Sequence, residues 1–236
     1  MGFMGIDIYY IILVVPTLAL SAIAQVMVKS TFAKYSKVRC SRQITGVDAA
    51  ALLLKANNIN NVQIEATGGS LTDHYDPSAR KLRLSQPVYG VPSIAAVGVA
   101  AHETGHAIQH AVKWGPLALR SVLVPPANIG SKFGPLIAAA GLLISGTSYS
   151  PWATLLISIG ILLFGAAVLF YIITLPVEFN ASSRAIAVLR ANNVLSEDEL
   201  KGVKKVLTAA AMTYVASALT AVMSLLRLIL LSRRRR

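Results

Sequence analysis

Four long apolar runs constrain this chain most, because about 20 consecutive apolar residues fold as a helix that crosses a bilayer. Residues 6–28 lack a basic region before them and a small-residue cleavage site after them, which favours an uncleaved transmembrane helix over a signal peptide. Residues 133–175 hold two runs with a short break and predict a transmembrane hairpin. Residues 206–231 are expected to span the bilayer or lie in its interface, before a basic tail at 232–236.

Two polar segments separate these runs. Residues 29–132 contain every histidine and mix helix and strand patterns, so we expect a water-facing α+β domain there. Residues 176–205 predict a polar helical segment. The fold class that follows is a mainly α membrane protein with about four transmembrane or membrane-associated helices and a small α+β domain.

The pattern of charged residues limits the classes of partner that the protein is expected to bind. The formal net charge is +12, but Lys and Arg are scattered beside apolar runs and do not form an aromatic-laced basic face. We therefore expect no nucleic-acid partner, and a lipid bilayer with anionic headgroups as the counterpart. The single cysteine, Cys40, excludes an intrachain disulfide and a cysteine-rich metal cluster.

Secondary-structure signals in the water-facing segment predict a small sheet before a helix. Thr45 and Asp48 have capping-box spacing at the start of an apolar helical run. Residues 61–66 alternate as a half-buried strand does, and residues 71–85 predict two extended arms around a turn. If the second arm, "KLRLS" at 81–85, is an edge strand, it could bind substrate by strand addition, although a plain structural strand is equally expected.

Three of the four histidines fall on one helix, expected at about 92–113. His102, Glu103 and His106 form H-E-x-x-H, which puts both imidazoles on one helix face and lets the carboxylate reach a water on the metal. The alternative is an amphipathic helix with polar histidines. The apolar residues around the motif favour a metal, because they are expected to bury the charge of Glu103, and a buried charge needs a partner such as a metal ion. We predict one Zn²⁺ per chain, with Glu103 as the catalytic base.

A third protein ligand must come from outside this motif. The extended signature H-E-x-x-H-x-x-G-x-x-H needs a glycine and a histidine where this chain has Gln109 and Val112. His74 and His110 remain candidates. Glu178 is the better one, because it follows the third apolar run, where a transmembrane helix would meet the polar layer.

The motifs together carry a family resemblance. "HETGHAIQH", "LPVEFNASSRA", "LTDHYDP" and "KLRLSQPVY" resemble the bacterial YugP-type membrane zinc metallopeptidases from about residue 35 to residue 226, and more distantly the HtpX-like membrane metallopeptidases. The resemblance implies that His102, His106 and Glu178 are zinc ligands and that Glu103 is the catalytic base. It also implies a zincin-like catalytic domain, with the third ligand on a later helix.

The residues after Glu178 differ from the family pattern. Aspartates usual in these families are replaced by Asn180 and Ser182, which can still hydrogen-bond to a ligand histidine or to Glu178, with less charge to orient it. Arg184 is expected to pair with a nearby carboxylate, or less favourably to stabilise an oxyanion. His74 could donate to the transition state, although a polar hairpin tip explains it equally well.

These features predict a membrane-embedded, gluzincin-like zinc endopeptidase that acts on peptides or membrane-protein segments. A transmembrane hairpin would return Glu178 to the side of His102. Basic residues after the first helix favour a multi-pass protein of a bacterial cell membrane with a cytoplasmic active site, although the arginine tail argues against this orientation. A regulatory membrane partner or a homo-oligomer is expected to restrain proteolysis.

Two other function classes were considered. A non-proteolytic, zinc-stabilised membrane scaffold or adaptor would use the metal for folding alone. A transporter is disfavoured, because its spans would carry ionisable residues, and here Arg227 is the exception, near a helix end from which it could snorkel.

Overall fold

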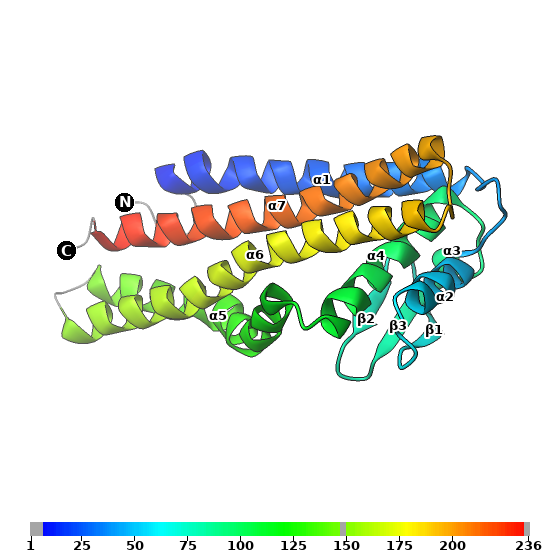
Figure 1. The fold of residues 1–236 in the computed structure, drawn as a ribbon. Coiled ribbons are helices and arrows are strands. Elements are labelled where there is room, and N and C mark those ends of the chain that lie inside the picture. Colours follow the sequence, from blue (N-terminus) through cyan, green and yellow to red (C-terminus); the bar gives the residue numbers. More distant parts are fainter. Residues whose placement is uncertain (1–6, 147–149, 234–236) are drawn as a thin grey trace. The chain divides into compact units, whose positions relative to one another are not determined.

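A computed structural model describes residues 7–146 and 150–233. Most of the described chain is helical, with one small sheet (Figure 1). The elements are η1 (Tyr10–Val14), α1 (Val15–Ser36), α2 (Gly46–Ala56), β1 (Gln63–Thr67), β2 (His74–Asp76), β3 (Lys81–Ser85), α3 (Gln86–Tyr89), α4 (Ile94–Ala111), α5 (Gly115–Ser145), α6 (Pro151–Ala191) and α7 (Glu197–Arg233). This architecture confirms the predicted mainly α membrane protein with a small α+β part.

Four helical segments are long and apolar enough to cross a membrane: Tyr10–Ser36, Gly115–Ser145, Pro151–Ala191 and Glu197–Arg233. Helix α5 begins at Gly115, whereas the sequence suggested a hairpin starting at residue 133. It continues through Pro125 and Pro126, whose rings are exposed. Each proline lacks the backbone N–H that would donate to the carbonyl one turn earlier, and α5 nevertheless extends well beyond the most apolar stretch of this segment.

The chain divides into two compact units. The span unit contains Met1–Ala24, Leu119–Leu175 and Thr213–Arg236. The histidine unit contains Gln25–Ala118 and Pro176–Met212.

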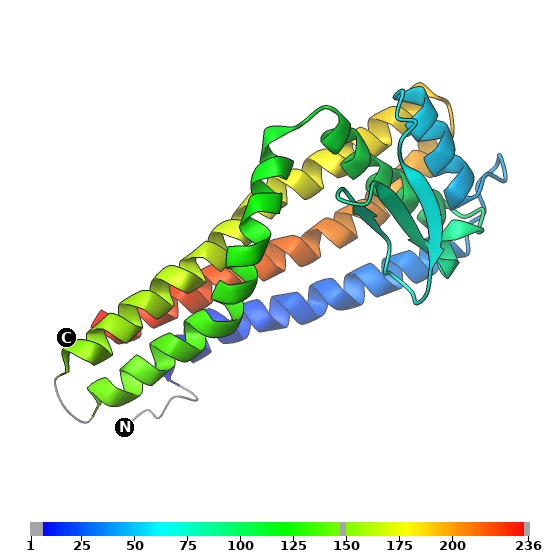
Figure 2. The ribbon, with the colours of Figure 1, turned by 90° about the horizontal axis from the view of Figure 1, so that it is seen from below.

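Glycines bring α5 and α6 together within the span unit. A Cβ on Gly130 would overlap the carbonyl group of Leu163, and one on Gly141 would lie 2.7 Å from the carbonyl oxygen of Ala153. The two helices therefore run antiparallel with their backbones in contact (Figure 2). Small residues permit this close approach, as is usual for packed membrane helices.

An ion pair joins α7 to the residue before the first helix. Arg227 Nε lies 2.9 Å from Asp7 Oδ2, and its guanidinium group lies 5.0 Å from the centre of the Tyr10 ring. Asp7 Oδ1 also accepts a hydrogen bond from the backbone N–H of Tyr10. Arg227 is thus held by Asp7, a partner that the sequence pattern did not predict.

The histidine unit holds a three-stranded sheet in the order β1-β3-β2. β2 and β3 pair antiparallel, which confirms the predicted two-armed segment, while β1 pairs parallel to β3. β3 is therefore the central strand, so the plain structural strand, one of the two alternatives for residues 81–85, is confirmed, and the substrate-binding edge strand is wrong. Leu82 and Leu84 lie on one face of β3 and are fully buried in a cluster that includes alanines of α4.

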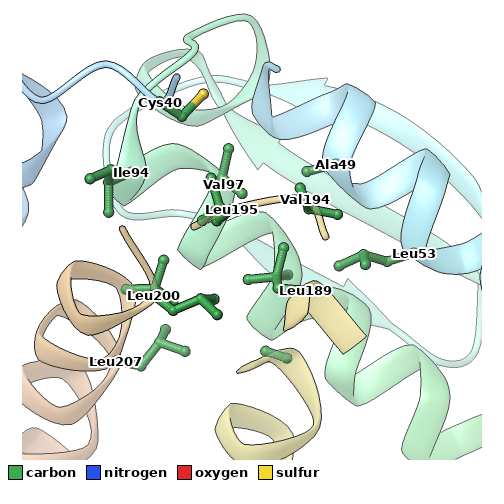
Figure 3. Close-up of a cluster of buried hydrophobic side chains, with 13 residues drawn as sticks. Cys40, Ala49, Leu53, Ile94, Val97, Leu189, Val194, Leu195, Leu200 and Leu207 are labelled. Atoms are coloured by element: carbon green, nitrogen blue, oxygen red, sulfur yellow. The ribbon is translucent and has the colours of Figure 1, made fainter. Parts of the chain in front are cut away.

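Caps and core fix helix α4 inside this unit. Thr45 and Asp48 form the predicted capping box of α2, and Ser93 Oγ accepts a hydrogen bond from Ala96 N at the start of α4. Figure 3 shows Val97 of α4 surrounded by side chains from neighbouring elements. They include Leu53 of α2, Leu189 of α6 and Leu200 of α7. This packing buries α4 on most sides and holds it next to α6.

Candidate active site

The site forms where α4 and α6 make backbone contact. Gly105 of α4 has no side chain at the point where the two helices are closest, and a Cβ there would lie 2.5 Å from the carbonyl oxygen of Ala181 in α6. One turn of helix separates His102 from His106, so both imidazoles face the same neighbour. Glu178 lies on α6, one turn before Ala181, and so reaches both histidines.

His102, His106 and Glu178 come together as a group that could hold a metal ion. Their ligand atoms all lie within 4.8 Å of one another. Glu178 Oε2 is 3.2 Å from His102 Nε2 and 3.6 Å from His106 Nε2, and the two rings meet edge to face. Glu178 is only 2% exposed, so its charge is stabilised by these partners and not by water.

The donor set and its spacing fit zinc. Two imidazole nitrogens and one carboxylate oxygen are the ligands of many catalytic zinc sites. Bonds of about 2.0–2.2 Å in a tetrahedron place ligand atoms about 3.3–3.6 Å apart. The two distances to Glu178 Oε2, 3.2 and 3.6 Å, are near that spacing, and the two imidazole nitrogens lie within 4.8 Å of each other.

Ser182 supports the first histidine. Its Oγ lies 3.1 Å from His102 Nδ1, the ring nitrogen that does not face Glu178. A partner at Nδ1 holds the ring in one orientation and leaves Nε2 to bind the metal. The sequence predicts this kind of contact for Ser182 or Asn180, and Ser182 makes it.

Gln109 supports the second histidine, a role that the sequence motifs did not predict. Its Oε1 lies 3.0 Å from His106 Nδ1, while Nε2 donates to Val177 O and to Asn180 Oδ1. The signal was present in the sequence, because Gln109 is a polar residue three positions after His106 on a helix expected to be buried.

Glu103 lies on α4 beside the cluster and is 9% exposed. The side chains of His102 and His106 keep 14% and 10% of their surface exposed. The site is therefore shielded from bulk water without being sealed, which strengthens electrostatic interactions inside it.

The other candidates lie in separate contacts. His74 is exposed on β2, with Nδ1 2.8 Å from Thr72 O and Nε2 3.2 Å from Arg83 Nη1. His110 Nδ1 is 2.8 Å from the Tyr75 hydroxyl, and burial raises the pKa of that phenol, which favours its role as the donor. Among the described residues, neither histidine belongs to the metal-capable cluster.

Arg184 pairs with a neutral group. Its Nε donates to Asn180 Oδ1 at 2.7 Å, so it reaches the site through Asn180 and Gln109. The structure therefore shows Arg184 in a pairing role and not beside an oxyanion. Its partner is the amide of Asn180, whereas a carboxylate was expected.

Comparisons with known proteins agree with this geometry. A family model described as "Putative neutral zinc metallopeptidase" matches residues 10–233. The chain is 46% identical over 222 residues to the "Putative membrane protease YugP" of Bacillus subtilis (strain 168), an alignment that covers 94% of this chain and 96% of the relative. No solved structure matches the chain. The chain therefore belongs to the family described as "Putative neutral zinc metallopeptidase", as its motifs had indicated.

Proposed function

We propose that this protein is a membrane-embedded zinc endopeptidase with one zinc ion held by His102, His106 and Glu178. The observation that carries the proposal is the spacing of their ligand atoms, 3.2 and 3.6 Å from Glu178 Oε2 to the two imidazoles. The arrangement, with a glutamate ligand on a separate helix, is gluzincin-like. A cluster of this kind beside the H-E-x-x-H glutamate supports hydrolysis better than simple metal storage.

Glu103 is the proton carrier in this proposal. A bound zinc ion supplies Lewis acidity, which lowers the pKa of a water molecule in the site and polarises the scissile carbonyl. The Glu103 carboxylate takes a proton from the water as the water oxygen bonds to the scissile carbonyl carbon, and it then delivers that proton to the nitrogen as the C–N bond breaks. His102 and His106 stay in place during these steps because Ser182 and Gln109 hold their Nδ1 atoms.

The substrates proposed are peptides and segments of membrane proteins. Glu178 follows the apolar run at 152–174 by only a few residues, which supports a site near the membrane surface. Exposed Lys29, Lys34 and Lys37 follow the first apolar run, and this supports a cytoplasmic site in the membrane of a bacterium. A membrane partner or a second copy of the chain is proposed to limit access.

A zinc-stabilised scaffold is the second candidate. The observation that favours it is the position of the three donors, which would let a metal tie α4 to α6. In that case the carboxylate of Glu103 would be dispensable, because it is not part of the cluster.

The Glu103→Gln variant separates the two functions. The purified protein in detergent is incubated with casein and a fluorogenic peptide mixture, and its zinc content is measured in parallel. We expect the parent to cleave and the variant to lose about 100-fold or more of the rate while keeping its zinc, since general acid–base catalysis contributes about 10²–10⁴-fold. Equal cleavage by both proteins would exclude the proposed role of Glu103. Zinc binding without cleavage in the parent would favour the scaffold.

A further inference from the structure

The side-chain amide of Gln109 bridges the two helices that carry the ligands. Gln109 is fully buried on α4. Its oxygen faces His106 Nδ1 at 3.0 Å, and its nitrogen donates to Val177 O at 2.8 Å and to Asn180 Oδ1 at 3.0 Å, both on α6. Both N–H groups of the amide therefore donate a hydrogen bond, and its oxygen faces one partner, His106.

The orientation of this amide is determined by its neighbours. Val177 O is a backbone carbonyl and can only accept a hydrogen bond, so the Gln109 group that faces it must be the NH₂. Asn180 is oriented in the same way, because Arg184 has only donors and its Nε faces Asn180 Oδ1 at 2.7 Å. Both constraints direct Gln109 Oε1 to His106, where it can only accept.

We propose that Gln109 is a positioning residue, which selects the Nδ1–H tautomer of His106 and holds that ring at the spacing required for zinc. The inference rests on the proposed zinc site. A neutral imidazole that donates from Nδ1 carries its lone pair on Nε2, the atom that lies 3.6 Å from Glu178 Oε2. Asn180 and Arg184 act indirectly, because Arg184 orients Asn180 and Asn180 orients Gln109.

The role is specific for a glutamine. An ionised glutamate at position 109 could still accept from His106, but it would place a negative oxygen against Val177 O and Asn180 Oδ1, which are themselves acceptors here. Methionine has similar length and can neither accept from nor donate to these groups effectively. The structure thus uses a neutral amide where other metal sites place a carboxylate next to the ligand histidine.

The test compares zinc affinity in matched variants of the full-length protein in detergent. Gln109→Met removes the bridge, and Thr104→Val is the control, because Thr104 is equally buried on α4 and its hydroxyl bonds only to Ala100 O within the helix. Affinity is measured by competition with a chelating dye, and ligand geometry by the visible spectrum of the cobalt-substituted protein. Loss of such a supporting contact typically weakens metal affinity about 10–100-fold. We expect that loss and an altered cobalt spectrum in Gln109→Met, with little change in the control.

Asn180 provides a second route to the same bridge, should Gln109→Met fail to fold. Asn180→Leu removes the acceptor for Gln109 and is expected to weaken zinc binding, whereas Asn180→Asp keeps that acceptor and should preserve most of the affinity. Unchanged affinity and an unchanged cobalt spectrum in Gln109→Met, or in Asn180→Leu, would overturn the inference. Absence of zinc binding in the parent would instead overturn the proposed function, so the two failures are distinguishable.

Discussion

Gly105 of α4 and Ala181 of α6 pack backbone to backbone, with space for no more than a hydrogen atom on Gly105. The contact lies between the helices that carry the histidines and Glu178, so it sets their separation. We predict that Gly105→Ala weakens zinc binding by at least about 10-fold, because the methyl group would push α4 from α6 and move the histidines relative to Glu178, which disturbs the site at least as much as the loss of a supporting contact. Alanine would otherwise stabilise the helix by about 1 kcal/mol relative to glycine.

Gly105→Ala is informative because alanine favours the helix while its methyl group is expected to weaken zinc binding. Zinc affinity and the melting temperature of the metal-free protein are measured together. A variant that melts higher and binds zinc as the parent does would show that the close approach of α4 and α6 does not control the site.

Ser182 should tune the first histidine. Ser182→Ala removes the partner of His102 Nδ1, and we expect an affinity for zinc about 10-fold lower. Ser182→Asp should restore or increase the affinity, because a carboxylate makes a stronger, charge-assisted hydrogen bond. Ser183→Ala on the exposed neighbouring position is the control. Equal zinc titrations for Ser182→Ala and Ser183→Ala would contradict the role of Ser182.

The ion pair of Asp7 and Arg227 should stabilise the span unit. Arg227→Met leaves the Asp7 carboxylate partly buried without its guanidinium partner, at an expected loss of at least about 2 kcal/mol. In a chain of this size that corresponds to a fall of roughly 4–8 °C in melting temperature. Lys132→Met, which changes an exposed cation on α5, should have little effect. We expect that the double variant Asp7→Asn with Arg227→Met loses less melting temperature than the sum of the losses of the two single variants.

Acid should weaken the β2–β3 turn through Asp76. Hydrogen bonds from the Ser78 hydroxyl and from the backbone N–H of Ala79, together with Arg83, hold the pKa of Asp76 well below its usual range. The unfolded chain therefore takes up a proton at about pH 4, before the folded one does. This carboxylate stabilises the fold above that pH, and its contribution disappears as the pH falls towards the lowered pKa.

The measurement compares thermal unfolding of metal-free parent and Asp76→Asn from about pH 6 to about pH 3. Chelation removes the separate effect of acid on metal binding. At the upper pH the parent should have a higher melting temperature than Asp76→Asn, and this difference should become smaller as the pH falls. A gap that stays constant over this range would show that Asp76 ionisation does not contribute to stability.

Local patterns were sufficient for much of the fold and for the centre of the site. The spans follow from apolar length, the α2 capping box from Thr45 and Asp48, and the histidine helix from H-E-x-x-H. Each of these signals lies within a few residues of the structure it produces. Glu178 was also named from sequence, and the structure brings it to the histidines.

Features that depend on distant residues could not be read in this way. The central position of β3 results from parallel pairing with β1, which no local pattern records. Arg227 meets Asp7 across 220 positions of sequence, and Gln109 meets Asn180 across 71. A glutamine on a buried helix only becomes interpretable once its partners on the neighbouring helix are known.

Zinc content per chain tests the central claim most directly, because it needs no knowledge of the substrate. Elemental analysis is made on the detergent-purified parent and on Glu178→Ala, after equal exposure to zinc and removal of loosely bound metal. The account predicts about one zinc per chain in the parent and a clear loss in the variant, since three protein ligands are needed for tight binding at such a site. Zinc retained in full by Glu178→Ala, or absent from the parent, would contradict it.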